Sequence, residues 1–169
     1  GSGKSTLVKI IAGVLSPTAG TVAFSLNDSN VHALDVFSLV GFVAPYLQLY
    51  DEFTGWENLH LARRIRGLAI PDHRLDELLQ RVRLGPRKDD RVRTYSSGMK
   101  QRLKYAFALL HAPPVLLLDE PTSNLDTDGI AIVYEIIEEQ KERGIVIVAT
   151  NDEDDVRRCR AVVNLEQAG

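Results

Sequence analysis

Residues 1–6 read Gly1-Ser2-Gly3-Lys4-Ser5-Thr6, and this stretch decides how the rest of the chain is interpreted. Its glycines expose backbone N–H groups, its lysine supplies a positive charge, and its serine hydroxyl can bind Mg²⁺. The apolar residues after it stand at i, i+3, i+4 and i+7, which indicates a helix with one buried face: Leu7, Ile10, Ile11 and Val14. A Gly-Lys-Ser tripeptide alone is a weak signal and fits a surface turn. A helix directly behind it favours a phosphate-binding loop, because the helix N-terminus attracts anions.

A phosphate site that uses Mg²⁺ also needs a carboxylate at the end of an apolar strand. The run Val115-Leu116-Leu117-Leu118-Asp119 provides one, and Glu120 stands beside it. An acid pair at a strand end is sometimes only structural. With the loop also present, the sequence predicts that Asp119 holds the metal and that Glu120 orients or deprotonates a water molecule.

The remaining pattern alternates helices and strands, which predicts an α/β fold with a mostly parallel sheet flanked by helices. Periodicity and β-branched runs predict strands at 21–26, 39–43, 115–118, 145–150 and 162–163, the first closed by a turn at Asn27-Asp28. They predict helices at 58–66, around 75–82, at 97–111 and around 130–137. Six basic and two acidic residues lie between Arg81 and Arg93, which we interpret as a solvated surface rather than a phosphate-binding patch.

Composition narrows the possible partners. The 169 residues are 44% hydrophobic and 25% charged, which is enough apolar material for one compact domain. The net charge of −3 gives no reason to expect a nucleic-acid partner.

The sequence also bears on where the chain is found. A single cysteine, Cys159, excludes an intrachain disulfide and fits a reducing cytosol. The longest apolar runs are far shorter than the roughly 20 residues that span a bilayer. Because the chain begins at Gly1, we expect an upstream part to be missing.

Two further segments resemble one family. The stretch Tyr95-Ser96-Ser97-Gly98-Met99-Lys100-Gln101-Arg102 resembles the signature motif of ABC ATPases, and Asp119-Glu120-Pro121-Thr122-Ser123-Asn124-Leu125-Asp126 resembles their Walker B motif and D-loop. The order of the motifs is also that of the family. The resemblance implies one P-loop NTPase domain over 1–169, with a core α/β part at 1–44 and 112–169 and a helical part at 45–111. It also implies that the first strands, with an adenine-stacking aromatic residue, are absent.

The resemblance implies ATP and Mg²⁺ as ligands and a dimer of ATPase domains, identical or different. The phosphates would lie against Gly1, Ser2, Gly3, Lys4, Ser5 and Thr6, with Ser5 and Asp119 at the metal and Glu120 at the attacking water. In the family, the signature segment of one subunit caps the γ-phosphate held by the other. That role would fall to Ser96, Ser97, Gly98, Met99 and Gln101, together with Asp126 of the D-loop. An ordinary serine N-cap explains the serines but not the rest of the motif.

The sequence departs from the family pattern at two positions. Pro45 stands where the family has the glutamine of the Q-loop, and a proline can neither bind Mg²⁺ nor hold a water. Our hypothesis is that Gln48 takes over when the dimer closes. Asn151 stands where the family has its switch histidine. An amide can hydrogen-bond to a phosphate oxygen but cannot carry a proton, so we expect slower turnover with Glu120 carrying the water chemistry.

The resemblance implies an ATP-hydrolysing subunit at the cytoplasmic face of a membrane, coupled to a membrane-spanning permease through the helices of 56–93. The spelling of 45–54 and 97–100 is similar to exporter ATPases of the haem and drug efflux kind. Two alternatives stay open: an ATP-gated regulatory module that hydrolyses little, and an ABC ATPase unrelated to transport. The DNA-repair kind inserts a long coiled coil before the signature, whereas here Ser97 lies only 93 positions after Lys4 (97 − 4). The ribosome-associated kind joins two such domains in one chain.

Overall fold

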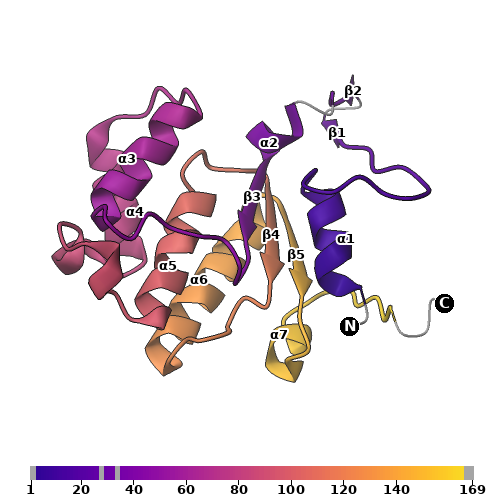
Figure 1. Cartoon of the computed structure of the whole chain (residues 1–169). Coiled ribbons are helices and arrows are strands. Elements are labelled where there is room, and N and C mark those ends of the chain that lie inside the picture. The colour runs from indigo at the N-terminus through magenta and orange to yellow at the C-terminus, as the bar shows by residue number, and fades with distance from the viewer. Residues whose placement is uncertain (1–2, 27–28, 33–34, 166–169) are drawn as a thin grey trace.

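The computed structural model describes residues 3–26, 29–32 and 35–165. Gly1 and Ser2 of the predicted phosphate loop, and the predicted turn at Asn27-Asp28, lie outside the described residues. Three parallel strands form the centre of the molecule, with α1 on one face and α5 and α6 on the other (Figure 1).

In chain order the helices are α1 (Lys4–Ile11), α2 (Val36–Leu39), α3 (Gly55–Ile65), α4 (Asp72–Arg81), α5 (Ser97–Ala108), α6 (Thr127–Arg143) and α7 (Glu153–Arg157), with short 3₁₀ helices η2 (Gly85–Arg87) and η3 (Val92–Thr94). The strands are β1 (Ser25–Leu26), β2 (Ser29–Asn30), β3 (Val40–Val43), β4 (Val115–Asp119) and β5 (Ile145–Ala149). Local sequence sets several boundaries. Thr54 and Glu57 form a reciprocal capping box that begins α3.

The main sheet has the order β3-β4-β5, with both pairs parallel. Parallel neighbours place their carboxyl ends at one edge of the sheet, and α1, α5 and α6 begin near that edge (Figure 1). Ligands of open α/β sheets bind outside the carboxyl ends of the strands. The edge at Asp119 is therefore where a site is expected.

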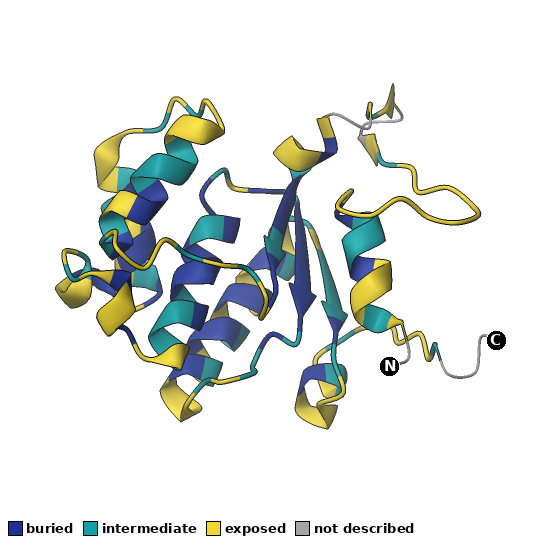
Figure 2. Ribbon diagram, in the orientation of Figure 1, coloured by how far each residue is buried: buried dark blue, intermediate teal, exposed yellow. Residues whose placement is uncertain are grey.

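The core divides into two layers because successive side chains of a strand point to opposite faces. Leu116 and Leu118 pack with the helical part, in a cluster that includes Leu59, Leu79 and Leu103. On the other face of β4, Val115 and Leu117 pack against α1 and α2 through side chains that include Val8 and Val36. β3, β4 and the inward sides of α4, α5 and α6 are largely buried, whereas β5 is mostly half-buried and α1 leaves much of its surface exposed (Figure 2).

Several predicted elements are shorter than expected or missing. Of the strand predicted at 21–26, only Ser25 and Leu26 pair, because their partner β2 is itself two residues long. The strand predicted at Val162-Val163 is wrong: both side chains are largely exposed, and no ladder pairs them within the described residues. Two β-branched residues do not hold a strand without a hydrogen-bonded neighbour. The first helix ends at Ile11, which leaves Val14 outside it, and α5 ends at Ala108 rather than at 111.

The basic stretch from Arg81 to Arg93 lies on the surface, where its cations pair with nearby carboxylates. Arg81 contacts Glu139, and Lys88 contacts Asp76 at 2.7 Å. Both Arg91 and Arg93 approach Glu52. These exposed pairs support the interpretation as a solvated, ion-paired surface.

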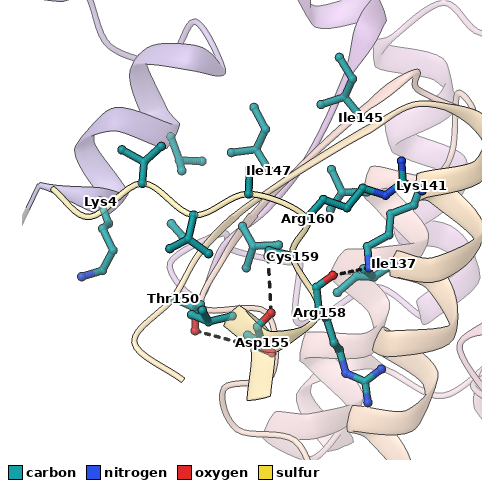
Figure 3. Close-up of a pocket in the computed structure, with 18 of the residues that line it drawn as sticks. Lys4, Ile137, Lys141, Ile145, Ile147, Thr150, Asp155, Arg158, Cys159 and Arg160 are labelled. Atoms are coloured by element: carbon teal, nitrogen blue, oxygen red, sulfur yellow. Dashed lines mark hydrogen bonds between the residues drawn. The ribbon is translucent and has the colours of Figure 1, made fainter. Parts of the chain in front are cut away.

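β5 is an edge of the described sheet, and an apolar groove of about 580 Å³ runs along it. The groove lies between β5 and α1 on one side and α6 with residues 158–165 on the other (Figure 3). Ile145 and Ile147 line it from the strand, and Lys141 and Arg160 from the opposite side. Among the described residues, no helix is both long and apolar enough to cross a bilayer.

Candidate functional site

The described part of the phosphate loop leads straight into α1. Gly3 precedes the helix with φ of 81°, a left-handed conformation that glycine adopts without steric cost. The helix then begins at Lys4, two residues earlier than the end of the motif, so Lys4, Ser5 and Thr6 lie in its first turn. The positive end of the helix dipole is therefore at these residues.

Ser5 and Asp119 lie together although 114 residues separate them. The Ser5 hydroxyl donates a hydrogen bond of 2.9 Å to Oδ1 of Asp119, which is almost fully buried at the end of β4. A hydroxyl and a carboxylate oxygen are hard ligands, and Mg²⁺ usually takes one or two protein oxygens and keeps several waters. The pair fits that donor set.

Glu120 follows Asp119 in a strained conformation, with φ of 49°. Its N–H donates to the carbonyl oxygen of Ala149 over 2.8 Å, which extends the contact between β4 and β5 by one residue. A non-glycine residue at positive φ has a backbone cost that the surrounding structure must offset, and such residues concentrate at functional sites. Here the conformation turns the chain sharply just beyond Asp119.

Asn151 reaches the carboxylate of Glu120 from the end of β5. Its Nδ2 donates a hydrogen bond of 3.1 Å to Oε1 of Glu120. Partial burial raises the pKa of Glu120, the negative charge of Asp119 raises it further, and the bond from Asn151 opposes the rise. A carboxylate whose pKa is shifted toward neutrality is better suited to accept a proton from water.

Tyr46, which sequence reasoning missed, lies beside Asp119. Burial raises the pKa of Tyr46 to about 12, and the charge of Asp119 and a side-chain hydrogen bond to it contribute. The ammonium group of Lys9 lies 4.1 Å from the centre of the Tyr46 ring. The phenol therefore stands next to the carboxylate proposed for Mg²⁺, at the position after Pro45.

Gln48 is not brought to this carboxylate. Its exposed side chain lines a separate cavity of about 250 Å³, together with Phe37, Arg66 and Phe107. The reason lies in the turn after β3. Lys104 of α5 donates hydrogen bonds to the carbonyl oxygens of Ala44 (3.2 Å) and Pro45 (2.6 Å), which anchors the turn with Tyr46 near Asp119. A lysine on a predicted amphipathic helix gave no signal for this contact.

The signature segment begins α5 on the far side of the sheet. Ser96 caps the helix by accepting a hydrogen bond from the N–H of Met99, and Ser97 is exposed at its first position. Gly98 packs closely on the loop after β4, because a Cβ there would lie 3.3 Å from the carbonyl oxygen of Asn124. Since α1 and α5 cover opposite faces of the sheet (Figure 1), this segment and Lys4 lie on different faces of the chain.

Two other predicted binding residues have local roles within the chain. Asp126 caps α6 by accepting a hydrogen bond of 2.8 Å from the N–H of Gly129. Gln101 is buried in α5, and its Nε2 has no hydrogen-bond partner among the described residues. The structure thus brings together Ser5, Asp119, Glu120 and Asn151, and it leaves the signature residues elsewhere.

Comparisons with known proteins point to one family. The ABC transporter family matches residues 1–123. The chain is 41% identical over 154 residues to YdbJ, an uncharacterized ABC transporter ATP-binding protein of Bacillus subtilis, and the match covers 89% of this chain and 49% of YdbJ. It is 34% identical to the lantibiotic transport ATP-binding protein SrtF of Streptococcus pyogenes (89% and 64% covered) and 36% identical to the daunorubicin resistance ATP-binding protein DrrA3 of Streptomyces coeruleorubidus (89% and 48%). The chain therefore spans about half the length of several curated relatives that it matches.

Solved structures show the same fold. An ATP-binding subunit of an ABC transporter superposes with a TM-score of 0.77 at 32% identity, covering 94% of this chain and 68% of that one. CbiO1 of Clostridium perfringens, part of the transporter complex CbiONQ, gives 0.70 at 29% identity (90% and 64% covered). The dimeric structure of MJ0796, a bacterial ABC transporter cassette, gives 0.77 at 25% identity (92% and 73% covered). By its motifs, its fold and these similarities, the chain belongs to the ABC transporter family as an ATP-binding domain.

Proposed function

We propose that this chain is the ATP-hydrolysing part of an ABC transporter and that it works as a dimer coupled to a membrane permease. The observation that carries the proposal is the meeting of Ser5 with Asp119, and of Glu120 with Asn151, at one edge of the sheet. The four residues come from α1, the end of β4 and the end of β5. Their chemistry fits a phosphoryl group, a metal and a water molecule side by side.

Each residue then has a role. Lys4 and the N–H groups of the loop, including Gly1, Ser2, Gly3 and Thr6, hold the phosphates, with Ser5 and Asp119 at Mg²⁺. When bound, Mg²⁺ would neutralise phosphate charge. Glu120 orients the attacking water and accepts its proton, and Asn151 holds Glu120 and can also donate to a γ-phosphate oxygen. Positioning and charge stabilisation supply most of the rate enhancement in such reactions.

The position of the signature segment supports a dimer. Ser96, Ser97 and Gly98 form a helix N-terminus on the face of the sheet away from Lys4, so they would bind the nucleotide of a second ATPase domain. We assign Met99, Gln101 and Asp126 the same role, contact with the nucleotide of the second domain. A related bacterial cassette, MJ0796, has been solved as a dimer.

The partner and the direction of transport rest on the relatives. SrtF is a lantibiotic transport ATP-binding protein and DrrA3 a daunorubicin resistance ATP-binding protein, which supports an exporter, and CbiO1 is part of the ABC transporter complex CbiONQ. We assign the permease contact to the helices of 56–93, within the part 45–111, and place the protein at the cytoplasmic face of the membrane. Residues 1–44 and 112–169 then form the core α/β part.

The test compares the full-length natural protein with its Glu120→Gln variant, each with and without its permease. The variant keeps the shape of the side chain but loses the base, so permease-stimulated ATP hydrolysis should disappear while an ATP-dependent dimer accumulates. Equal hydrolysis by both proteins would contradict the role of Glu120. An ATP-dependent dimer with no hydrolysis by the natural protein would favour the ATP-gated regulatory module, which the amide at position 151 also suggests.

A further inference from the structure

A buried carboxylate on α7 joins three elements of the domain. Asp155 is 3% exposed and accepts three hydroxyl hydrogen bonds. Thr150 donates to its Oδ2 over 2.8 Å and Thr122 to the same atom over 3.3 Å, while Tyr134 of α6 donates to Oδ1 over 3.1 Å. Figure 3 shows Asp155 beneath the end of β5, with its bond to Thr150.

Two of these three hydroxyls belong to the segments that carry Glu120 and Asn151. Thr150 immediately precedes Asn151, and Thr122 stands two residues after Glu120. A single oxygen atom of Asp155 therefore ties the end of β5 to the loop that leaves β4. The hydrogen bond between Asn151 and Glu120 joins the same two segments.

We infer that Asp155 is a positioning residue that fixes Glu120 relative to Asn151 through Thr122 and Thr150, an inference that rests on the proposed function. Hydrogen bonds to a buried carboxylate are stronger than those in water, so the two segments are held firmly. Asp155 is fixed in turn, because Asp152 caps α7 by accepting hydrogen bonds from the N–H groups of Asp154 (2.8 Å) and Asp155 (3.4 Å). Arg158, one turn further on, lies over the Tyr134 ring at 3.8 Å.

The hydrogen bond from Tyr134 to Asp155 supplies a matched control. Tyr134 donates to the same carboxylate over a similar distance, but it belongs to α6 and leads away from Glu120 and Asn151. A merely structural role predicts that losing any of the three hydroxyls has the same consequence. A positioning role predicts that only the two threonines matter for the chemical step.

The experiment measures kcat and KM for ATP, and thermal unfolding, in the full-length natural protein and four variants. Thr122→Val and Thr150→Val remove one hydroxyl each while keeping the branched shape, and we expect kcat to fall by about 10- to 100-fold with KM unchanged. Tyr134→Phe should keep kcat near that of the natural protein. Thr122→Ser, which restores a hydroxyl, should recover the rate. Thr122→Val is the cleaner variant, since Thr150 also accepts a hydrogen bond from the N–H of Asp152.

Three results would overturn the inference: kcat unchanged in both valine variants, an equal loss in Tyr134→Phe, or losses that follow the fall in melting temperature. Glu120→Gln, measured in parallel, separates this inference from the function on which it rests. Full hydrolysis by that variant would overturn the role of Glu120 and the inference together. An inactive Glu120→Gln variant beside unaffected threonine variants would overturn the inference alone.

Discussion

The amide of Asn151 donates a hydrogen bond to Oε1 of Glu120 over 3.1 Å, which joins the end of β5 to the end of β4. Burial and the charge of Asp119 raise the pKa of Glu120, and this bond opposes them. An uncharged amide thus helps to keep the proposed base ionised. It does so without a proton of its own to lose, unlike a histidine at the same position.

Replacing Asn151 by alanine should therefore slow hydrolysis and change its pH dependence. Without the bond the pKa of Glu120 rises further, and a base is active only when ionised, so activity should be lost at a higher pH as the solution is acidified. A hydrogen bond to a charged group contributes about 1.5 kcal/mol, so we expect kcat at neutral pH to fall by about tenfold. The measurement is kcat as a function of pH, and an unshifted acidic limb would contradict it.

The reverse substitution, Asn151→His, should raise the rate. A histidine can donate to a γ-phosphate oxygen as a cation, which stabilises developing negative charge better than an amide. Steady-state hydrolysis of the two proteins, with and without permease, checks this. An unchanged rate would mean that the amide does not limit turnover.

Tyr46 and Gln48 are alternatives for the place beside Asp119, the carboxylate proposed for Mg²⁺, and the structure puts Tyr46 there. Loss of a group that orients a metal ligand typically weakens metal affinity by about tenfold or more, so Tyr46→Phe should raise the Mg²⁺ concentration needed for half-maximal hydrolysis to that extent. Gln48→Ala should leave the Mg²⁺ dependence unchanged. The opposite pattern would support our hypothesis from sequence that Gln48 moves in when the dimer closes.

Ser97→Glu distinguishes a purely structural role at the start of α5 from a nucleotide-binding role. A carboxylate in the first turn of α5 interacts favourably with the helix dipole, by about 0.3–1 kcal/mol, so the isolated domain should be at least as stable as before. The same charge would repel a γ-phosphate from a second subunit. We therefore expect an unchanged or higher melting temperature together with loss of ATP-dependent dimerisation in the Glu120→Gln background. Ser97→Ala, which adds no charge, is the control, and dimers that survive Ser97→Glu would contradict the role.

His111 makes the stability of the fold depend on pH. Burial and the positive charge of Arg66 lower the pKa of His111 to about 4, whereas an unfolded histidine titrates near 6.5. Between these two pH values the unfolded chain binds more protons than the folded chain. The contribution of neutral His111 to stability is therefore complete above about pH 6.5 and is lost as the pH falls toward about 4.

Allowing for the partial exposure of the ring, we expect a loss of about 1–2 kcal/mol over that range. Denaturant unfolding of the natural protein and of His111→Gln, each at several pH values, measures it. A similar decline in both proteins would assign the pH dependence to other groups.

Much of the framework could be predicted from the sequence because its signals are local. Apolar residues at helical spacing predicted α3, α4 and α6, and short β-branched or leucine-rich runs predicted β3, β4 and β5. The two strand predictions that were too long or wrong share a cause. The strands predicted at 21–26 and 162–163 depend on pairing partners, and no local pattern tells whether a partner exists.

The motifs alone determined the family, because the loop at Lys4, the signature at Ser97 and the acid pair at Asp119 and Glu120 each have a characteristic spelling. Tertiary structure decided which side chains meet. Parallel strands bring their carboxyl ends to one edge, which places Asn151 on Glu120, and Lys104 anchors the turn that puts Tyr46 rather than Gln48 at Asp119. Asp155 gave no signal in the sequence, since its role comes from three hydroxyls on separate elements. A sequence motif is set by residues that are neighbours along the chain, whereas the relative positions of distant side chains are set by contacts that form only when the elements pack together.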